Sequence, residues 1–396
     1  MSNAIPRKRL QDFCQIEIGG TPSRGVPEFW AEQGKGHPWV AISDLGPRHI
    51  TSTAEQITDS AIPRSNVKAV PRGTVLMSFK LTLGRMGIAG TDLFTNEAIA
   101  AFYPDTSQAL PEWLYYALPE AVSTAQFDTA VKGATLNKEK LRNLMVLLPT
   151  TVVEQEGIAN VLSALDEQLE ATESLIEKLT QRRKGLVQEH LLPAATSAST
   201  VALGDVCSVI TSGSRGWAQY YAPEGDLFLR IGNLTRAHPN LRFDDVVFVN
   251  PPAAGEGQRT RLEAGDVLIS ITADLGIIGC IPESFGTAYI NQHIALARLS
   301  DADLDPRWVA HVLASPFGSE QISKLNDGGA KAGLNLTTIN ALRVPKPSLE
   351  TQKELAALLD AADEEIASEQ ALAVKLHLQK QGLMRDLLTG KTRVLQ

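Results

Sequence analysis

The sequence contains an internal repeat, which constrains the fold more than any other feature. The run EQEGIANVLSALDE at 154–167 returns as TQKELAALLDAADE at 351–364. The offset of 197 residues holds without a gap from Gln155 and Gln352 to Leu191 and Leu388. A chain of this kind is expected to fold as two copies of one unit.

The segments upstream of these runs also match, although more loosely. GTVLMS at 73–78 resembles GDVLIS at 265–270, and NEAIA at 96–100 resembles NQHIA at 291–295. The offset drifts because short insertions and deletions are tolerated in loops. Both segments are rich in Gly and Pro and contain short β-branched runs, with Trp113 and Trp308 as expected core residues of short helices. They predict two similar mixed α/β domains.

Each copy ends in a segment without proline whose apolar residues recur at alternating spacings of four and three, a heptad pattern. A helix of about 37 residues is roughly 55 Å long and is not stable alone with one apolar stripe. The two segments are therefore expected to pair as an antiparallel coiled coil. The matched seam positions include Leu162/Leu359, Leu169/Ile366, Thr172/Glu369, Leu179/Leu376, Arg183/Lys380 and His190/Leu387.

The predicted fold is therefore α+β, with two domains separated by two long helices in a pseudo-two-fold dumbbell. The equivalent glycines Gly185 and Gly382 lie inside the helices and suggest a close approach or a kink. The predicted boundaries are 1–149 for the first domain, 150–192 for the first helix, 193–200 for a linker, 201–347 for the second domain, 348–389 for the second helix and 390–396 for a tail.

Composition restricts the classes of function. The three cysteines form no CxxC pair, which favours a reducing cytoplasm over a disulfide scaffold or zinc module, and we expect no metal site. The sequence contains no run of 18 apolar residues, so we expect no membrane-spanning helix. The net charge is −8, and residues 1–149 carry only +1, so any contact with DNA depends on local loops or on a partner.

At this point the residues resemble a known family, the specificity subunits of type I restriction-modification enzymes. The resemblance covers essentially the whole chain and includes GGTPS at 19–23, PWVAISDL at 38–45, LRNLMVLLP at 141–149 and RDLLTGKTRV at 385–394. The second domain departs from it, with TSGSRGW at 211–217 in place of the GGTP form.

The resemblance implies a non-catalytic, cytoplasmic subunit without cofactors that reads a bipartite, asymmetric site in double-stranded DNA. It implies docking of two methyltransferase subunits on the helices, joined by restriction and translocase subunits. Two other functions stay open as alternatives, a coiled-coil structural adaptor and a stand-alone methyltransferase.

No motif predicts a catalytic site. NPP at 250–252 is followed by Ala253, whereas an adenine methyltransferase needs an aromatic ring there to stack on the base. GKT at 390–392 lacks the glycine that a phosphate-binding loop needs, because Arg385 occupies its place.

Base readout requires polar or cationic side chains on turn-rich loops. Trp217, beside Arg215, is expected either to pack or to contact DNA. The candidate DNA-binding residues of the first domain are Thr21, Ser23, Arg24, Ser43, Asp44, Lys80, Arg85, Lys132, Asn137 and Lys138, and those of the second are Ser214, Arg215, Trp217, Arg230, Asn233, Thr272, Asp274, Lys331 and Asn335.

Overall fold

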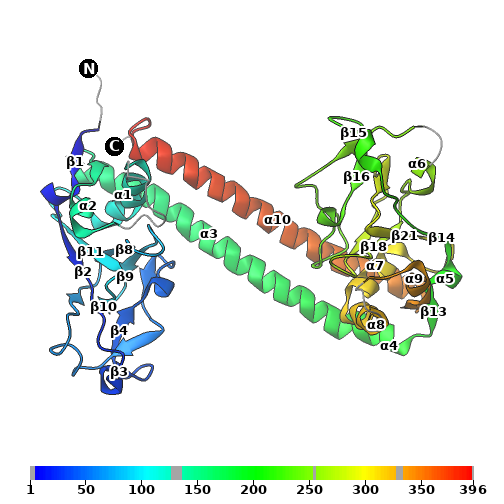
Figure 1. Cartoon of the computed structure of the whole chain (residues 1–396), viewed down its shortest axis with the longest axis horizontal. Helices are drawn as coiled ribbons and strands as arrows, with labels where there is room; N and C mark the ends of the chain where they lie inside the picture. Colours follow the sequence, from blue (N-terminus) through cyan, green and yellow to red (C-terminus); the bar gives the residue numbers. More distant parts are fainter. Residues whose placement is uncertain (1–4, 126–135, 253–255, 327–332, 395–396) are drawn as a thin grey trace. The chain divides into compact units, whose positions relative to one another are not determined.

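The computed structural model describes residues 5–125, 136–252, 256–326 and 333–394. The chain divides into two compact units (Figure 1). Unit 1 comprises residues 1–171 and 372–396, and unit 2 comprises residues 172–371. Each unit thus contains one globular domain together with part of both long helices, as the repeat predicts.

The described residues of unit 1 form two five-stranded sheets and one two-stranded sheet. The parallel pair β4·β10 aligns Trp39 with Phe94. In order across each sheet, the strands are β3 (Trp30–Ala31), β6 (Glu55–Ile57), β4 (His37–Val40), β10 (Leu93–Thr95) and β7 (Ala69–Val70); β2 (Cys14–Ile18), β11 (Ile99–Pro104), β8 (Val75–Ser78), β9 (Met86–Ala89) and β5 (His49–Ile50); and β1 (Arg7–Arg9) with β12 (Met145–Leu147).

Unit 2 repeats this plan, and the part of it that the structure describes forms two four-stranded sheets and one two-stranded sheet. The parallel pair β16·β20 aligns Phe228 with Tyr289, the counterpart of Trp39 with Phe94. The strands, in order, are β14 (Cys207–Ser212), β21 (Ile294–Leu299), β18 (Val267–Ser270) and β19 (Ile278–Cys280); β15 (Tyr221–Ala222), β17 (Phe248–Val249), β16 (Asp226–Leu229) and β20 (Ala288–Ile290); and β13 (Thr200–Ala202) with β22 (Arg343–Pro345).

Short helices accompany the sheets of both units, and the two that contain Trp113 and Trp308 begin at Pro111 and Pro306, because proline suits the first helical turn. Trp113 and Trp308 on these two helices are fully buried, as predicted. The short helices are α1 (Pro111–Thr124), α2 (Lys138–Arg142), α4 (Leu192–Ser197), α5 (Leu203–Val206), α6 (Glu256–Arg259), α7 (Pro306–Ala314), α8 (Pro316–Asn326) and α9 (Leu336–Ala341).

The long helices are α3 (Val152–Leu186) and α10 (Leu349–Leu388). The hydroxyls of Thr151 and Ser348 accept from backbone N–H groups of the first turns, which caps both helices. Within unit 1 the first turns of α3 and the last turns of α10 lie side by side in opposite directions (Figure 1), with Leu165 and Leu169 in one apolar cluster with Leu376.

The predicted seam is correct along most of α3 but wrong at its end. Val187–Leu191 forms a π-helical turn, whose hydrogen bonds span one more residue than those of an α-helix. The buried positions therefore move from the predicted Leu186 and His190 to Val187 and Leu191, and His190 is exposed. Helical structure then continues through α4 to Ser197.

The equivalent glycines Gly185 and Gly382 do not mark a close approach. A Cβ atom built on either residue would meet no other atom within 4 Å. Gly185 directly precedes the last residue before the π-helical turn, so a local change of helical geometry lies next to it, whereas Gly382 lies inside the continuous helix α10.

A buried glutamine joins each globular domain to its long helix. The amide of Gln155 accepts from Leu110 N–H and donates to the Gln108 carbonyl, both at 2.8 Å. Gln352 accepts from Asp305 N–H and donates to the Asp303 carbonyl, both at 2.9 Å. Gln155 and Gln352 begin the part of the repeat that has no gap. Gln155 fixes the start of α1 against α3, and Gln352 fixes the start of α7 against α10.

Candidate nucleic-acid interface

Three loops of unit 1 meet at one end of its sheets. They are residues 19–21 after β2, residues 78–85 between β8 and β9, and residues 95–99 between β10 and β11. Backbone hydrogen bonds join them, from Gly20 N–H to the Thr95 carbonyl at 2.8 Å and from Phe79 N–H to the Ala98 carbonyl at 2.9 Å. Gly19 packs so closely on Thr95 that a Cβ would lie 2.2 Å from its carbonyl oxygen.

The corresponding loops of unit 2 are joined in the same way. Ile271 N–H donates to the His293 carbonyl at 2.9 Å. A Cβ on Gly213, the counterpart of Gly19, would lie 2.1 Å from the carbonyl oxygen of Asn291. The same scaffold of loops is therefore built twice, and the two copies differ mainly in their side chains.

Glu97 gathers three of the predicted residues of unit 1. The Thr21 hydroxyl donates to its carboxylate. This bond, together with the nearby charges of Lys80 and Arg24, holds the pKa of Glu97 below its usual range. The loops thus bring Lys80, which lies far from Thr21 and Arg24 in the sequence, close to the same carboxylate.

Arg24 is held in a defined position. Its guanidinium carbon lies 3.9 Å from the ring centroid of Trp30, and it forms a two-point ion pair with Glu55, with Nη2 to Oε2 at 2.9 Å. The hydrogen bond with Glu55 raises the pKa of Arg24, so the group stays charged. Ser23 beside it is exposed, and its carbonyl accepts from the Trp30 indole N–H at 3.3 Å.

In the corresponding loops of unit 2, some of the predicted DNA-binding residues contact other side chains of the same domain. The Trp217 indole donates to the Ser214 hydroxyl at 3.1 Å, and its ring stacks on Phe228 with centroids 4.9 Å apart. Trp217 is 4% exposed, so the packing alternative holds for it in this structure. Arg215 is exposed.

The neighbouring loop of unit 2 carries two more predicted residues. Thr272 hydrogen-bonds to His293 Nδ1, and Asp274 pairs with Arg236. Both Thr272 and Asp274 therefore already have intramolecular partners.

Asp44 and Asn233 shape equivalent turns. Asp44 accepts from Ala41 N–H at 2.8 Å, and Asn233 accepts from Arg230 N–H at 2.9 Å. Asn233 is 2% exposed and also donates to two backbone carbonyls. Ser43, next to Asp44, is exposed. The Arg230 side chain pairs with Asp245 at 2.6 Å.

Asn137 and Asn335 cap equivalent helices. Their side chains accept from Lys140 N–H and Thr338 N–H, both at 2.8 Å. Lys138 is half-buried on the first turn of α2, and Arg85 is exposed with Nη1 3.2 Å from the Ile42 carbonyl. Lys132 and Lys331 lie outside the residues that the structure describes.

Glu97, Arg236 and His293 contact predicted residues but were not themselves predicted. Glu97 and His293 belong to the repeated blocks NEAIA and NQHIA, so comparison of the two copies at these blocks was the available signal. No such signal pointed to Arg236, because its loop has no matching block in the first copy.

The three cysteines are buried or half-buried. Burial raises the pKa of Cys14 and of Cys207 to about 12, and that of Cys280 to about 11, which keeps the thiols protonated at neutral pH. Within the described residues one group, His311, Asp360 and Asp363, has the spacing of metal ligands.

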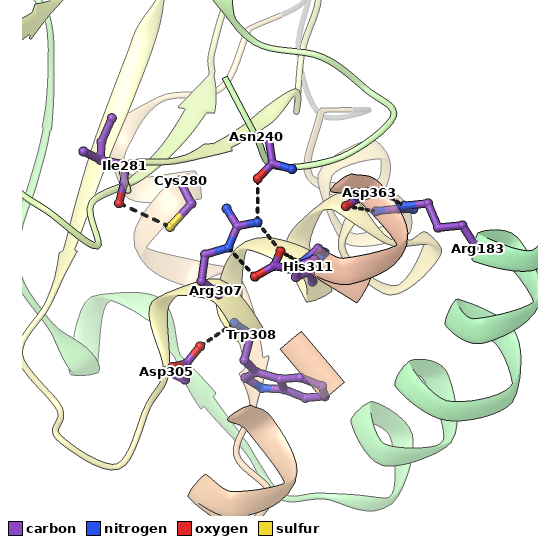
Figure 2. Close-up of polar contacts among 10 residues, drawn as sticks. Arg183, Asn240, Cys280, Ile281, Asp305, Arg307, Trp308, His311 and Asp363 are labelled. Atoms are coloured by element: carbon purple, nitrogen blue, oxygen red, sulfur yellow. Dashed lines mark hydrogen bonds and ion pairs between the residues drawn. The ribbon is translucent and has the colours of Figure 1, made fainter. Parts of the chain in front are cut away.

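That group already has cationic partners (Figure 2). Arg307 donates to Asp360, with Nε to Oδ2 at 3.0 Å, and to the Asn240 side chain at 2.6 Å. Arg183 donates to Asp363, with Nη2 to Oδ2 at 3.1 Å. Two guanidinium groups compensate these carboxylates, which disfavours a divalent cation.

Asn250, the first residue of the methyltransferase-like NPP run, has a local structural role. Its N–H donates to the Tyr220 carbonyl at 2.9 Å, and its side-chain amide donates to the Glu224 carbonyl at 3.3 Å. These bonds hold a turn. They leave the amide turned toward the backbone rather than toward a base.

Comparison with known proteins gives one family. The family described as "Type I restriction modification DNA specificity domain" matches residues 6–181 and 198–377, which is most of both units. The chain belongs to the type I restriction-modification specificity family. Its two matches coincide with the two copies of the repeat.

Relatives of this specificity family support the assignment. The chain is 27% identical over 169 residues to the MjaIX specificity subunit of Methanocaldococcus jannaschii, covering 41% of this chain and 38% of that protein. It is 21% identical over 337 residues to the MjaVIII specificity subunit of the same organism, covering 80% and 76%.

A solved structure shares the fold. The S subunit of a type I restriction-modification system from M. genitalium matches with a TM-score of 0.66 at 17% identity, over 98% of this chain and 97% of that one. No helix among the described residues combines the length and apolarity needed to cross a membrane.

Proposed function

We propose that this specificity-family chain reads a bipartite, asymmetric target in double-stranded DNA and contributes no catalytic group. The observation that supports this most directly is the loop scaffold built twice with different side chains. Thr21 and Lys80 surround Glu97 in unit 1, whereas Thr272 bonds to His293 in unit 2. Two readers with one scaffold and different loop chemistry recognise different half-sites.

The members of the predicted set whose side chains cap a turn or a helix, or pack inside the domain, fix the loops, and the other members are the proposed DNA contacts. Asp44, Asn233, Asn137 and Asn335 have the first role, and so does Trp217. The proposed contacts are Thr21, Ser23, Arg24, Ser43, Lys80, Arg85, Lys138, Ser214, Arg215, Arg230, Thr272 and Asp274, and Lys132 and Lys331 stay predictions.

We further propose that α3 and α10 dock two methyltransferase subunits, which restriction subunits then join. Each unit exposes an equivalent pair of apolar residues on the long helices: Val161 and Leu372 in unit 1, Leu358 and Leu175 in unit 2, all between 38% and 40% exposed. Each residue of one pair matches one of the other at the offset of 197. Equivalent exposed apolar positions on the two helices favour two copies of one partner.

The reading role is tested by sequencing the methylated bases of a host with and without the chain. The expected result is one bipartite motif that disappears with the chain. Replacing residues 201–346 with the corresponding segment of another family member should change one half-site only. A change in both half-sites, or no motif at all, contradicts the proposal.

The docking role is tested by the mass of the complex purified with methyltransferase subunits. Leu175→Asp and Leu372→Asp should each remove one subunit, and the double variant should remove both. Gln181→Asp and Gln381→Asp are matched controls, because both residues are exposed on other faces of the same helices. Retention of two subunits by the double variant contradicts the docking proposal.

The non-catalytic role has its own test. The purified chain alone should not transfer methyl groups to DNA from S-adenosylmethionine, whereas the complex should. Methyl transfer by the chain alone would establish the stand-alone methyltransferase instead. Unchanged host methylation after deletion of the chain would favour the structural adaptor.

A further inference from the structure

Leu81 has an unusual position for a large apolar side chain. It is 95% exposed, more than any other large hydrophobic residue in the described chain. It lies in the loop 78–85, one of the three loops of the candidate DNA interface of unit 1. Single exposed apolar side chains are common on protein surfaces, so the exposure of Leu81 is informative only together with the backbone and the charges around it.

The backbone of Leu81 is also unusual. Its φ angle of 63° is in the left-handed region, where a side chain of this size is disfavoured. Among the described residues, only one other residue besides glycine has a positive φ angle: Ala273, at 60°. Strained backbone of this kind persists where surrounding structure holds it, and it concentrates at functional sites.

Leu81 and Ala273 occupy the same place in the two copies. Both lie three residues after a matching serine, Ser78 or Ser270, and three before a glycine with positive φ, Gly84 or Gly276. The two positions are 192 residues apart, the offset of the surrounding blocks. The strained residue is therefore a feature of the loop scaffold and not a local accident.

One serine hydroxyl holds each loop in this shape. In unit 1 the Ser78 hydroxyl donates to the Thr82 carbonyl and accepts from Arg85 N–H at 3.0 Å. In unit 2 the Ser270 hydroxyl donates to the Asp274 carbonyl and accepts from Ile277 N–H at 2.7 Å. These bonds close the loop beneath Leu81 and Ala273 and fix the direction in which each residue projects.

The charges around Leu81 indicate the class of ligand. Lys80 precedes it, and the exposed Arg85 closes the same loop. The carboxylate of Glu97 near Lys80 already accepts from Thr21. Two cationic side chains on either side of a projecting apolar tip suit a polyanion whose bases offer apolar surface, which describes DNA.

We propose that Leu81 is a specificity-determining residue that contacts bases of the half-site read by the first domain through its apolar side chain. This inference rests on the proposed DNA-reading function. Leucine is a side chain that proteins insert against base steps, and apolar contact with thymine methyl groups also carries sequence information. Ala273 projects from the same place in the second domain with only a methyl group, so the second half-site lacks this contact.

The test uses the full chain purified with its methyltransferase subunits and three duplexes. One carries the motif found by sequencing of methylated host DNA, and the other two have one half-site scrambled. Leu81→Gly and Leu81→Asn are the variants, because glycine and asparagine tolerate left-handed backbone and keep the loop shape. Ala273→Gly is the matched control, since it relieves the left-handed backbone strain at the equivalent position of the other domain and removes only a methyl group.

We expect Leu81→Gly and Leu81→Asn to reduce discrimination against the scrambled first half-site about tenfold, the scale of one lost base contact. Discrimination against the scrambled second half-site should change less than twofold in these two variants. In Ala273→Gly, discrimination against either scrambled half-site should change less than twofold. Unchanged discrimination overturns the proposal, and so does an equal loss of affinity for all three duplexes. If the unsubstituted complex does not discriminate between the duplexes, the proposed reading function itself fails.

Discussion

Arg183 of α3 and Asp363 of α10 form a buried ion pair within unit 2, with Nη2 to Oδ2 at 3.1 Å. The equivalent positions in unit 1, Lys380 and Asp166, are also paired. Each cation is thus a polar interruption of one helix seam, and each is compensated by the aspartate of the other helix. Because both pairs require the antiparallel register, they select it over shifted alternatives.

Asp363→Ala is expected to destabilise unit 2 by about 3 kcal/mol, because it leaves the guanidinium of Arg183 partly buried without its partner. Urea unfolding followed by circular dichroism measures the change. Glu365→Ala is the matched control on the same helix. Glu365 pairs with Arg182 at 3.4 Å, but half of its side chain is exposed, and such pairs contribute little. Equal losses from both variants would contradict the role of the buried pair.

Asp360 should make the stability of unit 2 depend on pH. Burial alone would raise its pKa, but hydrogen bonds from His311 and Arg307 outweigh burial and bring the pKa to about 2 from the ordinary 3.8. A carboxyl group with a lowered pKa in the folded state stabilises the fold above about pH 4, and this contribution is lost as the pH falls toward 2.

Asp360→Asn should therefore lower the free energy of unfolding by roughly 2 kcal/mol at pH 5. This difference from the unsubstituted chain should shrink as the pH approaches 2. Urea unfolding at pH values between 5 and 2 measures it. Asp244→Asn is the control, since 87% of the Asp244 side chain is exposed. A difference that stays constant across this pH range would contradict the assignment.

Gly382→Ala is expected to stabilise the chain by about 0.5–1 kcal/mol. Gly382 lies inside α10, where alanine is the better helix former, and an added Cβ would meet no atom within 4 Å. Thermal unfolding should show a higher midpoint. Gly19→Ala is the contrasting variant, because its Cβ would clash with the Thr95 carbonyl and lower the midpoint. A neutral or destabilising Gly382→Ala would contradict the expectation that this glycine lowers the stability of α10.

Leu81→Gly should not destabilise unit 1, even though it removes a large side chain. Leu81 buries almost no surface, and glycine avoids a left-handed backbone strain of about 1–2 kcal/mol. Gly84→Ala in the same loop should destabilise by about 1 kcal/mol, because Gly84 has a φ of 82°. Thermal unfolding distinguishes the two. A clear loss of stability in Leu81→Gly would show that the leucine supports the fold.

The sequence by itself determined the repeat, the two long helices and most of their seam. These features depend on periodic apolar residues and on a constant offset, both of which are local properties of the chain. It also determined the core tryptophans Trp113 and Trp308, which recur on equivalent proline-started helices.

Only the tertiary structure decided which polar residues meet. Glu97 is brought to Thr21 by loops that lie far apart in the sequence, and the π-helical turn at Val187–Leu191 moved burial from His190 to Leu191. The left-handed backbone of Leu81 has no sequence signal, since leucine does not favour it. Such features depend on individual hydrogen bonds, some local and some between distant loops, that hold the backbone against the preference of its residues, and a pattern of residue types does not contain that information.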